Sequence, residues 1–140
     1  MKGPPVSVMF AVTPSWLIPL AVAVRSLCLH SSPHRNYELH IVHQGLEKRQ
    51  MKELEKAVSG YPHVSLGFSM LPEKLLRILN GRDCGRFSPL TYGRLLAADL
   101  FPRCDRLVYL DVDVLLNGDV AELYGADLQG APVGAVRDCA

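Results

Sequence analysis

The chain has 140 residues, enough for one domain with a single hydrophobic core. Apolar residues make up 49% of it and charged residues 21%, which is typical of a globular protein. Lys and Arg total 15 against 14 for Asp and Glu, so no net field would draw the chain to nucleic acid or to an anionic membrane.

The sequence contains no segment that we expect to cross a membrane. Its most apolar run, Trp16 to Val24, is too short to span a bilayer and contains Pro19. The first ten residues, MKGPPVSVMF, lack the apolar core of a signal peptide. We therefore expect a cytoplasmic protein without a transmembrane segment.

Strand and helix patterns alternate along the chain. An almost wholly apolar run favours a buried strand, and apolar residues three and four apart favour a helix. Strands are expected over residues 6–12, 37–43, 63–68 and 107–110, with a fifth over 131–136. Helices are expected over residues 17–28, 47–58 and 73–79, and from Ser88-Pro89 to a stop before Pro102. Ser15 is the expected N-cap of the first helix and Ser88 that of the last, which carries Tyr92, Leu95, Leu96 and Leu100 on its inner face.

This alternation predicts the α/β class, a mostly parallel sheet with helices on both faces. Ligands of such sheets bind beyond the carboxyl ends of the strands, near the point where the strand order reverses. Asp111 and Asp113 follow the apolar run 107–110, and the turn 12–15 follows the first strand. Both segments are expected at that edge of the sheet.

Two carboxylates one residue apart suggest a cation site. On a regularly pleated strand, Asp111 and Asp113 would point to the same side and share one divalent cation. Oxygen ligands suit Mg²⁺ and Mn²⁺, which leave room for phosphate oxygens. The alternative is that both acids are solvated residues at the end of a strand. Asp119, followed by Glu122, is better explained as the cap of a short helix.

Two other chemistries share the D-x-D pattern. A calcium loop would need another oxygen ligand at position 115, which is Leu, so that interpretation fails. A phosphatase of the haloacid dehalogenase type has an apolar strand followed by D-x-D-x-[TV], and DVDV matches it. That motif opens the sheet in those enzymes, whereas only 27 residues follow Asp113 here.

Between Phe87 and Asp138 the sequence contains TYGRL, then YLDVD, then NGDVAELY and GAVRD, over about fifty residues in order. This run of motifs resembles the family 8 glycosyltransferases, retaining enzymes of the GT-A fold that include lipopolysaccharide galactosyl- and glucosyltransferases and the glycogenins. Nearer the N-terminus, VMFAV and YELHIVHQGL fit the first two strands more loosely. The resemblance implies that residues 1–140 form the nucleotide-sugar-binding part of such a domain.

The resemblance also implies a ligand set. The donor would be a UDP-sugar, with Mn²⁺ or Mg²⁺ held by Asp111 and Asp113 and bridging the diphosphate, and with Arg94 reaching the phosphate or the sugar. The implied donor-binding residues are Ala11, Val12, Thr13, Arg94, Asp111, Val112, Asp113 and Asp138. The implied acceptor is a glycan or a glycolipid of the lipopolysaccharide type, which allows peripheral contact with a membrane. No catalytic residue is assigned.

The sequence departs from the family pattern in three places, one of which is Gly85-Arg86-Phe87, where the family often has a histidine near the acceptor. The family usually has an acid-containing loop of the type A-D-D-N-Y after the first strand. Here the loop reads Val12-Thr13-Pro14-Ser15-Trp16, where Thr13 offers a hydroxyl and Trp16 either stacks on the base or packs on a helix. The family's acceptor-binding half and a metal-binding histidine lie beyond GAVRD, and none of the five histidines here follows Asp113.

Two functions therefore remain open for this chain. The first is a transferase, or the truncated nucleotide-binding half of one, that moves a hexose from a UDP-sugar with retention. The second is a non-catalytic module that keeps the fold and binds a nucleotide or a partner. The phosphatase is a distant third and predicts release of inorganic phosphate without a sugar donor.

Overall fold

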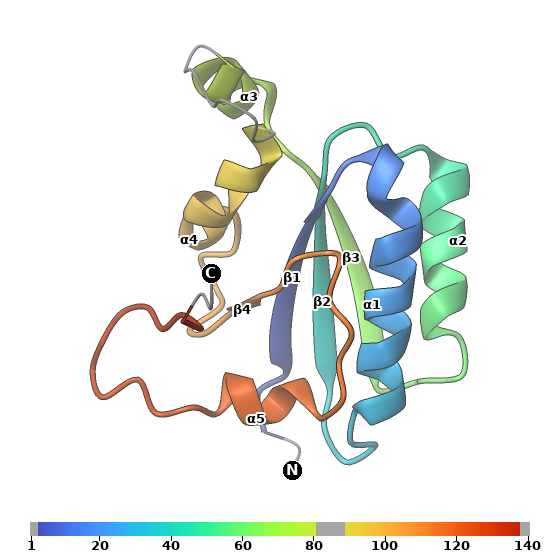
Figure 1. Ribbon diagram of the computed structural model, residues 1–140, viewed down its shortest axis with the longest axis vertical. Coiled ribbons are helices and arrows are strands. Elements are labelled where there is room, and N and C mark those ends of the chain that lie inside the picture. Colours follow the sequence, from blue (N-terminus) through green and yellow to red (C-terminus); the bar gives the residue numbers. More distant parts are fainter. Residues whose placement is uncertain (1–2, 81–88, 138–140) are drawn as a thin grey trace.

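The computed structural model describes residues 3–80 and 89–137 of the chain. Its centre is a four-stranded parallel sheet in the order β3-β2-β1-β4 (Figure 1). The strands are β1 (Val6–Val12), β2 (Tyr37–His43), β3 (Val64–Met70) and β4 (Val108–Tyr109). The predicted α/β class with a parallel sheet is confirmed.

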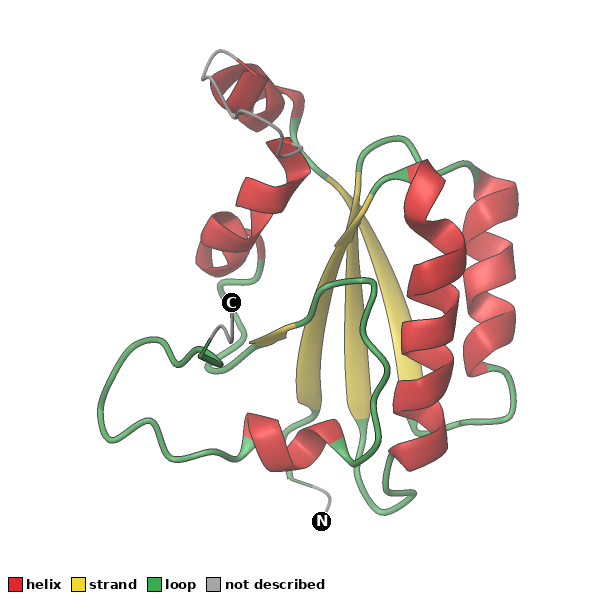
Figure 2. Ribbon diagram, viewed as in Figure 1, coloured by secondary structure: helices red, strands yellow, loops and turns green. Residues whose placement is uncertain are grey.

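Helices cover both faces of the sheet, as Figures 1 and 2 show. One face carries α1 (Leu17–His30) and α2 (Lys48–Val58), and the short α5 (Val120–Tyr124) lies at the amino-terminal edge. The other face carries the 3-10 helix η2 (Pro89–Leu96) and α4 (Ala97–Leu100). The remaining elements are η1 (Pro14–Trp16) and α3 (Glu73–Asn80).

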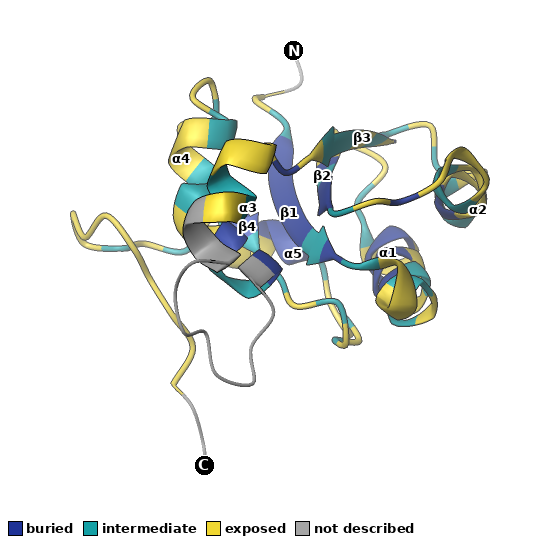
Figure 3. Ribbon diagram, turned by 90° about the horizontal axis from the view of Figure 1, so that it is seen from above, coloured by how far each residue is buried: buried dark blue, intermediate teal, exposed yellow. Residues whose placement is uncertain are grey.

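The alternation of side chains along β1 divides the core between these two faces. Val8 and Phe10 belong to the apolar cluster under α1 and α2, and Met9 belongs to the cluster under η2 and α4. All three side chains are fully buried, and Figure 3 shows β1 as a buried strand. The continuous apolar sequence of β1 thus follows from its central position in the sheet.

The starts of α1 and α2 differ in whether a side chain caps them. Ser15 is not an N-cap, because it lies inside η1 and α1 begins at Leu17 without a side-chain cap. At α2, Glu47 is the N-cap and forms a capping box with Gln50, whose Oε1 accepts from the Glu47 N–H at 2.9 Å. The helix ends before Gly60, which adopts a φ of +89°.

The helix expected before Pro102 is instead η2 followed by one turn of α4. Gly93 weakens the α-helix there, and a 3-10 helix has three residues per turn rather than 3.6. This difference turns Leu95 outward, and it is 75% exposed although the helical pattern placed it on the inner face. Ser88, the predicted cap, lies outside the described residues.

The predicted fifth strand over residues 131–136 is wrong. Residues 131–137 are exposed and belong to no strand or helix. The reason is local, because Pro132 has no N–H to donate to a ladder and no neighbouring strand is available to the segment within the described residues. The prediction for β4 is right in place but too long, since ladder pairing is limited to Val108 and Tyr109.

None of the helices in the described ranges combines the length and the apolar character needed to cross a bilayer.

Candidate functional site

The site expected from the sequence lies where β1 and β4 meet. The chain runs from β1 outward through β2 to β3 and then returns to place β4 on the opposite side of β1, so the strand order reverses between them. The Leu110 N–H donates to the Met9 carbonyl at 3.0 Å, which continues the pairing past the end of β4. The carboxyl ends of these two strands therefore lie side by side at the switch point.

Three side chains meet at the end of β4. The Arg94 Nη2 donates to Asp111 Oδ1 at 3.3 Å, and the Tyr109 hydroxyl donates to the same oxygen at 3.1 Å. The Arg94 guanidinium also lies over the Tyr109 ring, 4.4 Å from its centroid. The structure thus brings together Arg94 and Asp111, which are 17 residues apart in the sequence.

Arg94 is fixed by its own helix as well. Its Nε donates to the carbonyl of Thr91 within η2 at 2.8 Å. The side chains of Arg94 and Asp111 are 39% and 56% exposed, so water reaches the ion pair and screens it. The pair consequently contributes little to stability, and both charges remain accessible to a ligand.

Tyr109 is the member of this group that the sequence pattern does not reveal, because the pattern marks it only as part of the apolar strand. The available signal is its spacing, since a residue two positions before Asp111 on a strand lies on the same side. Burial, together with the nearby Asp111 carboxylate, raises the pKa of Tyr109 to about 12 despite the opposing effect of Arg94. The phenol is therefore protonated at neutral pH and acts as a hydrogen-bond donor.

Asp111 and Asp113 do not lie on the strand itself. β4 ends at Tyr109, and residues 112–113 form a turn. The alternation nevertheless persists, because Val112 and Val114 pack against the larger core cluster while the two acids are exposed. The inward packing of the valines keeps both carboxylates on the solvent side, as the i, i+2 spacing predicted.

Asp111 and Asp113 are the residues that could hold a metal ion at this edge of the sheet. The described part of the chain holds no group of three or more His, Cys, Asp and Glu side chains that could bind a metal ion. Asp113 makes no hydrogen bond or ion pair with any described residue, and Asp111 keeps Oδ2 available. Two carboxylates fit a hard cation such as Mg²⁺ or Mn²⁺ whose other ligands are water or phosphate oxygens.

The loop after β1 offers a hydroxyl and backbone groups. The Val12 side chain is buried in the core, so only its main chain can reach a ligand, and Ala11 is half-buried under η2. The hydroxyls of Thr13 and Ser15 lie 3.0 Å apart in one hydrogen bond. Trp16 is 48% exposed and is not among the described residues packed on the core.

Asp119 has the structural role that its sequence context predicts. Its carboxylate accepts from the N–H of Ala121 at 2.9 Å and caps α5. It also accepts from the buried hydroxyl of Tyr37, with 2.8 Å to each oxygen. Asp138, the last donor-binding residue expected from the sequence, lies outside the described residues.

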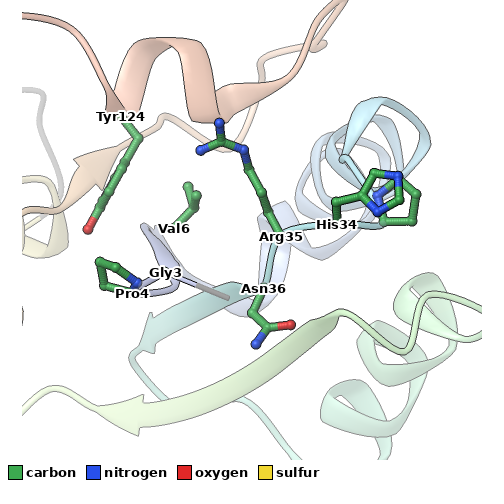
Figure 4. A pocket seen from close by; sticks show the side chains of 8 residues that line it. Gly3, Pro4, Val6, His34, Arg35, Asn36 and Tyr124 are labelled. Carbon is green, nitrogen blue, oxygen red and sulfur yellow. The ribbon is translucent and has the colours of Figure 1, made fainter. Parts of the chain in front are cut away.

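A hollow of about 720 Å³ lies at the opposite, amino-terminal edge of the sheet. Figure 4 shows Tyr124 and Arg35 on either side of Val6 at the start of β1. None of the candidate residues at the carboxyl edge lines it. It is therefore separate from the site between β1 and β4.

Comparison with known families gives one match that spans nearly the whole chain. The profile described as glycosyl transferase family 8 matches residues 7–140.

Three curated proteins illustrate the similarity. Glycosyltransferase GlyF of Streptococcus pneumoniae is 26% identical over 132 residues, which cover 94% of this chain and 31% of GlyF. In Arabidopsis thaliana, probable galacturonosyltransferase-like 10 is 27% identical over 138 residues, 96% of this chain and 37% of that protein. Probable galacturonosyltransferase 6 is 36% identical over 67 residues, 48% of this chain and 11% of that protein. The matched region thus spans between a tenth and two fifths of these relatives.

Solved structures share the fold. The bifunctional glycosyltransferase WbbM superimposes with a TM-score of 0.73 and 25% identity over 89% of this chain and 21% of that one. Galactosyltransferase LgtC, in complex with donor and acceptor sugar analogs, gives a TM-score of 0.71 and 22% identity over 88% of this chain and 43% of that one. These likenesses confirm the GT-A fold class expected from the sequence.

Proposed function

Because the chain belongs to glycosyl transferase family 8, we propose that it carries the donor-binding part of an enzyme that transfers a hexosyl group from a UDP-sugar. The relatives named above are glycosyltransferases, and the chain spans only part of each. The site residues, the donor, the metal and the acceptor are therefore inferences from this chain's own side chains and from the family resemblance.

One observation carries the proposal: exposed carboxylates and a cationic side chain adjoin one another at the switch point of the sheet. Arg94 lies 3.3 Å from Asp111, and Asp113 is exposed beside them. A diphosphate at this edge needs positive charge. Arg94 provides one such charge, and Asp111 with Asp113 would hold Mn²⁺ or Mg²⁺ as a second.

Each residue of the site has a definable task. A bound divalent cation would stabilise the negative charge that develops on the diphosphate as it leaves the sugar. Arg94 would bind a phosphate or the sugar, and Tyr109 would hold both Arg94 and Asp111 in place. Thr13 would offer its hydroxyl to the nucleoside, while Ala11, Val12 and Val112 would contribute backbone or packing contacts. Asp138 stays a prediction.

Retention of configuration and the acceptor rest on the family resemblance alone. A glycan or glycolipid acceptor would contact residues outside the described part, and the cytoplasmic location likewise stays a prediction from the sequence. The names of the Arabidopsis relatives add a uronic acid to the sugars worth testing on this chain.

A second candidate function is a non-catalytic module that binds a nucleotide. It is favoured by the first loop, where Thr13-Pro14-Ser15-Trp16 has no carboxylate for the nucleoside. Such a module would bind UDP but would not release it from a UDP-sugar. This difference separates the two functions by experiment.

Thermal unfolding with Mn²⁺ and a panel of nucleotides tests the proposal. UDP at about 100 times its Kd should add about 2.7 kcal/mol of stability and raise Tm by about 8–10 °C, whereas ADP and GDP should not. UDP released from UDP-glucose, UDP-galactose or UDP-galacturonic acid would favour the enzyme over the module. Equal shifts with all three nucleotides would contradict selectivity for a uridine donor.

A further inference from the structure

Asp111 Oδ1 is shared by two donors. Arg94 Nη2 approaches it at 3.3 Å and the Tyr109 hydroxyl at 3.1 Å. A cation that binds this carboxylate must therefore approach within a few ångströms of a guanidinium. Because two positive charges at that distance repel one another, Arg94 opposes binding of a cation in the absence of an anion.

Arg94 does not depend on Asp111 for its position. Its Nε is bound to the Thr91 carbonyl at 2.8 Å, and its guanidinium lies 4.4 Å from the centroid of the Tyr109 ring. These two contacts would hold the guanidinium at the end of β4 after its hydrogen bond to Asp111 is broken. With 39% of its side chain exposed, Arg94 is free to meet an incoming anion.

We propose that Arg94 and the divalent cation compete for Asp111, and that the donor's diphosphate relieves this competition. The inference rests on the function proposed above. Without nucleotide, Arg94 occupies Asp111 and weakens metal binding. With nucleotide, Arg94 pairs with the diphosphate, and Asp111 turns to the metal together with Asp113. Arg94 thereby couples metal binding to donor binding and prevents the site from filling with metal alone.

The coupling between metal binding and nucleotide binding can be measured from either ligand. Nucleotide should tighten metal binding, and by linkage metal should tighten nucleotide binding by the same factor. Removing the charge of Arg94 should tighten binding of metal alone by about three- to tenfold. The same change should reduce the coupling factor, since the neutral side chain neither opposes the metal nor attracts the diphosphate.

Titration with Mn²⁺ alone tests the proposal, with free Mn²⁺ followed by electron paramagnetic resonance. Arg94→Gln should bind Mn²⁺ more tightly than the unmodified chain, and Arg94→Lys, which keeps the charge, should resemble the unmodified chain. Arg49→Gln makes the same charge change on the exposed face of α2 and should have no effect. Circular dichroism establishes that each variant is folded.

A double-mutant comparison tests whether the effect of Arg94 depends on Asp111. In an Asp111→Asn background, Arg94→Gln should tighten Mn²⁺ binding much less, because the shared carboxylate is gone and only the repulsion between Arg94 and the cation remains. Undiminished tightening there, equal Mn²⁺ affinities for Arg94→Gln and Arg49→Gln, or no Mn²⁺ binding by any variant would overturn the proposal.

Titrating the same variants with UDP shows whether the competition or the proposed function has failed. Metal-dependent UDP binding without tighter Mn²⁺ binding by Arg94→Gln would leave the function standing and refute the competition. Tighter Mn²⁺ binding by Arg94→Gln without UDP binding would support the competition and refute the uridine donor.

Discussion

The Arg94 guanidinium lies 4.4 Å from the centroid of the Tyr109 ring. The hydroxyl of that same ring donates to Asp111 Oδ1 at 3.1 Å. One tyrosine at the end of β4 therefore contacts both charged groups and links η2 to the turn that carries the two carboxylates. Tyr109 is best described as a positioning residue, because it acts through Arg94 and Asp111.

Substitution at Tyr109 separates its two contacts. Tyr109→Phe keeps the ring under Arg94 and loses the hydrogen bond to Asp111, so metal-dependent UDP affinity should fall by about three- to tenfold, as expected for loss of one solvent-exposed hydrogen bond worth about 1 kcal/mol. Tyr109→Leu also loses the cation–π contact and should lower the affinity further. Calorimetric titration of UDP with Mn²⁺ measures both effects. Identical affinities for both variants and the unmodified chain would exclude a positioning role.

The bond between Tyr37 and Asp119 should matter for stability and not for the candidate site. Asp119→Ala removes the cap of α5 and leaves the buried Tyr37 hydroxyl without its acceptor. The expected loss in the free energy of unfolding is about 2–3 kcal/mol, from a lost cap and an unpaired buried donor. Urea unfolding measures it.

Asp127→Ala is the matched control for that measurement. The Asp127 carboxylate accepts from the N–H of Gln129 at 2.8 Å in an exposed turn, so its loss should cost less than about 1 kcal/mol. Equal losses at Asp119 and Asp127 would show that the Tyr37 contact contributes nothing.

His40 should make the fold sensitive to mild acid. Burial lowers its pKa below the ordinary value of 6.5, and its ring packs against Phe101 with 4.4 Å between centroids. Its buried Nε2 has no hydrogen-bond partner among the described residues. The unfolded chain therefore takes up a proton at a higher pH than the folded chain, and stability should fall as the pH drops below about 6.5.

Urea unfolding at pH 8, 6.5 and 5 tests this dependence on pH. His40→Leu should weaken it, leaving the part due to His43, whose pKa burial also lowers. The same change at His34, exposed in the loop before β2, should leave it as in the unmodified chain. An unchanged slope for His40→Leu would mean that His40 does not contribute.

Several elements could be predicted because one physical signal dominates each. β1 and β2 have the predicted bounds. The central strand β1 is recognisable by its almost wholly apolar run, and β2 by its partial alternation of apolar and polar residues. Asp119 caps α5 because the signal for a helix cap is local. The placement of Asp111 and Asp113 at the carboxyl edge follows from the topology of parallel sheets.

The remaining features depend on contacts that sequence patterns do not encode. Arg94 reaches Asp111 only because β4 returns to pair with β1, and Tyr109 joins them through a hydroxyl that an apolar pattern ignores. The segment 131–136 has the apolar residues of a strand without a neighbouring strand among the described residues. Leu95 is misplaced because the period of η2 is that of a 3-10 helix.

The central claim is that Asp111 and Asp113 hold a divalent cation that binds the donor's diphosphate. Its most direct test is calorimetric titration of UDP into the chain with Mn²⁺, repeated in EDTA and with the double variant Asp111→Asn/Asp113→Asn. Asp105→Asn/Asp127→Asn, at two other exposed acids, is the control. The account predicts UDP binding that EDTA and the first variant abolish and the control preserves. UDP binding that persists in both EDTA and the first variant would place the nucleotide elsewhere and contradict it.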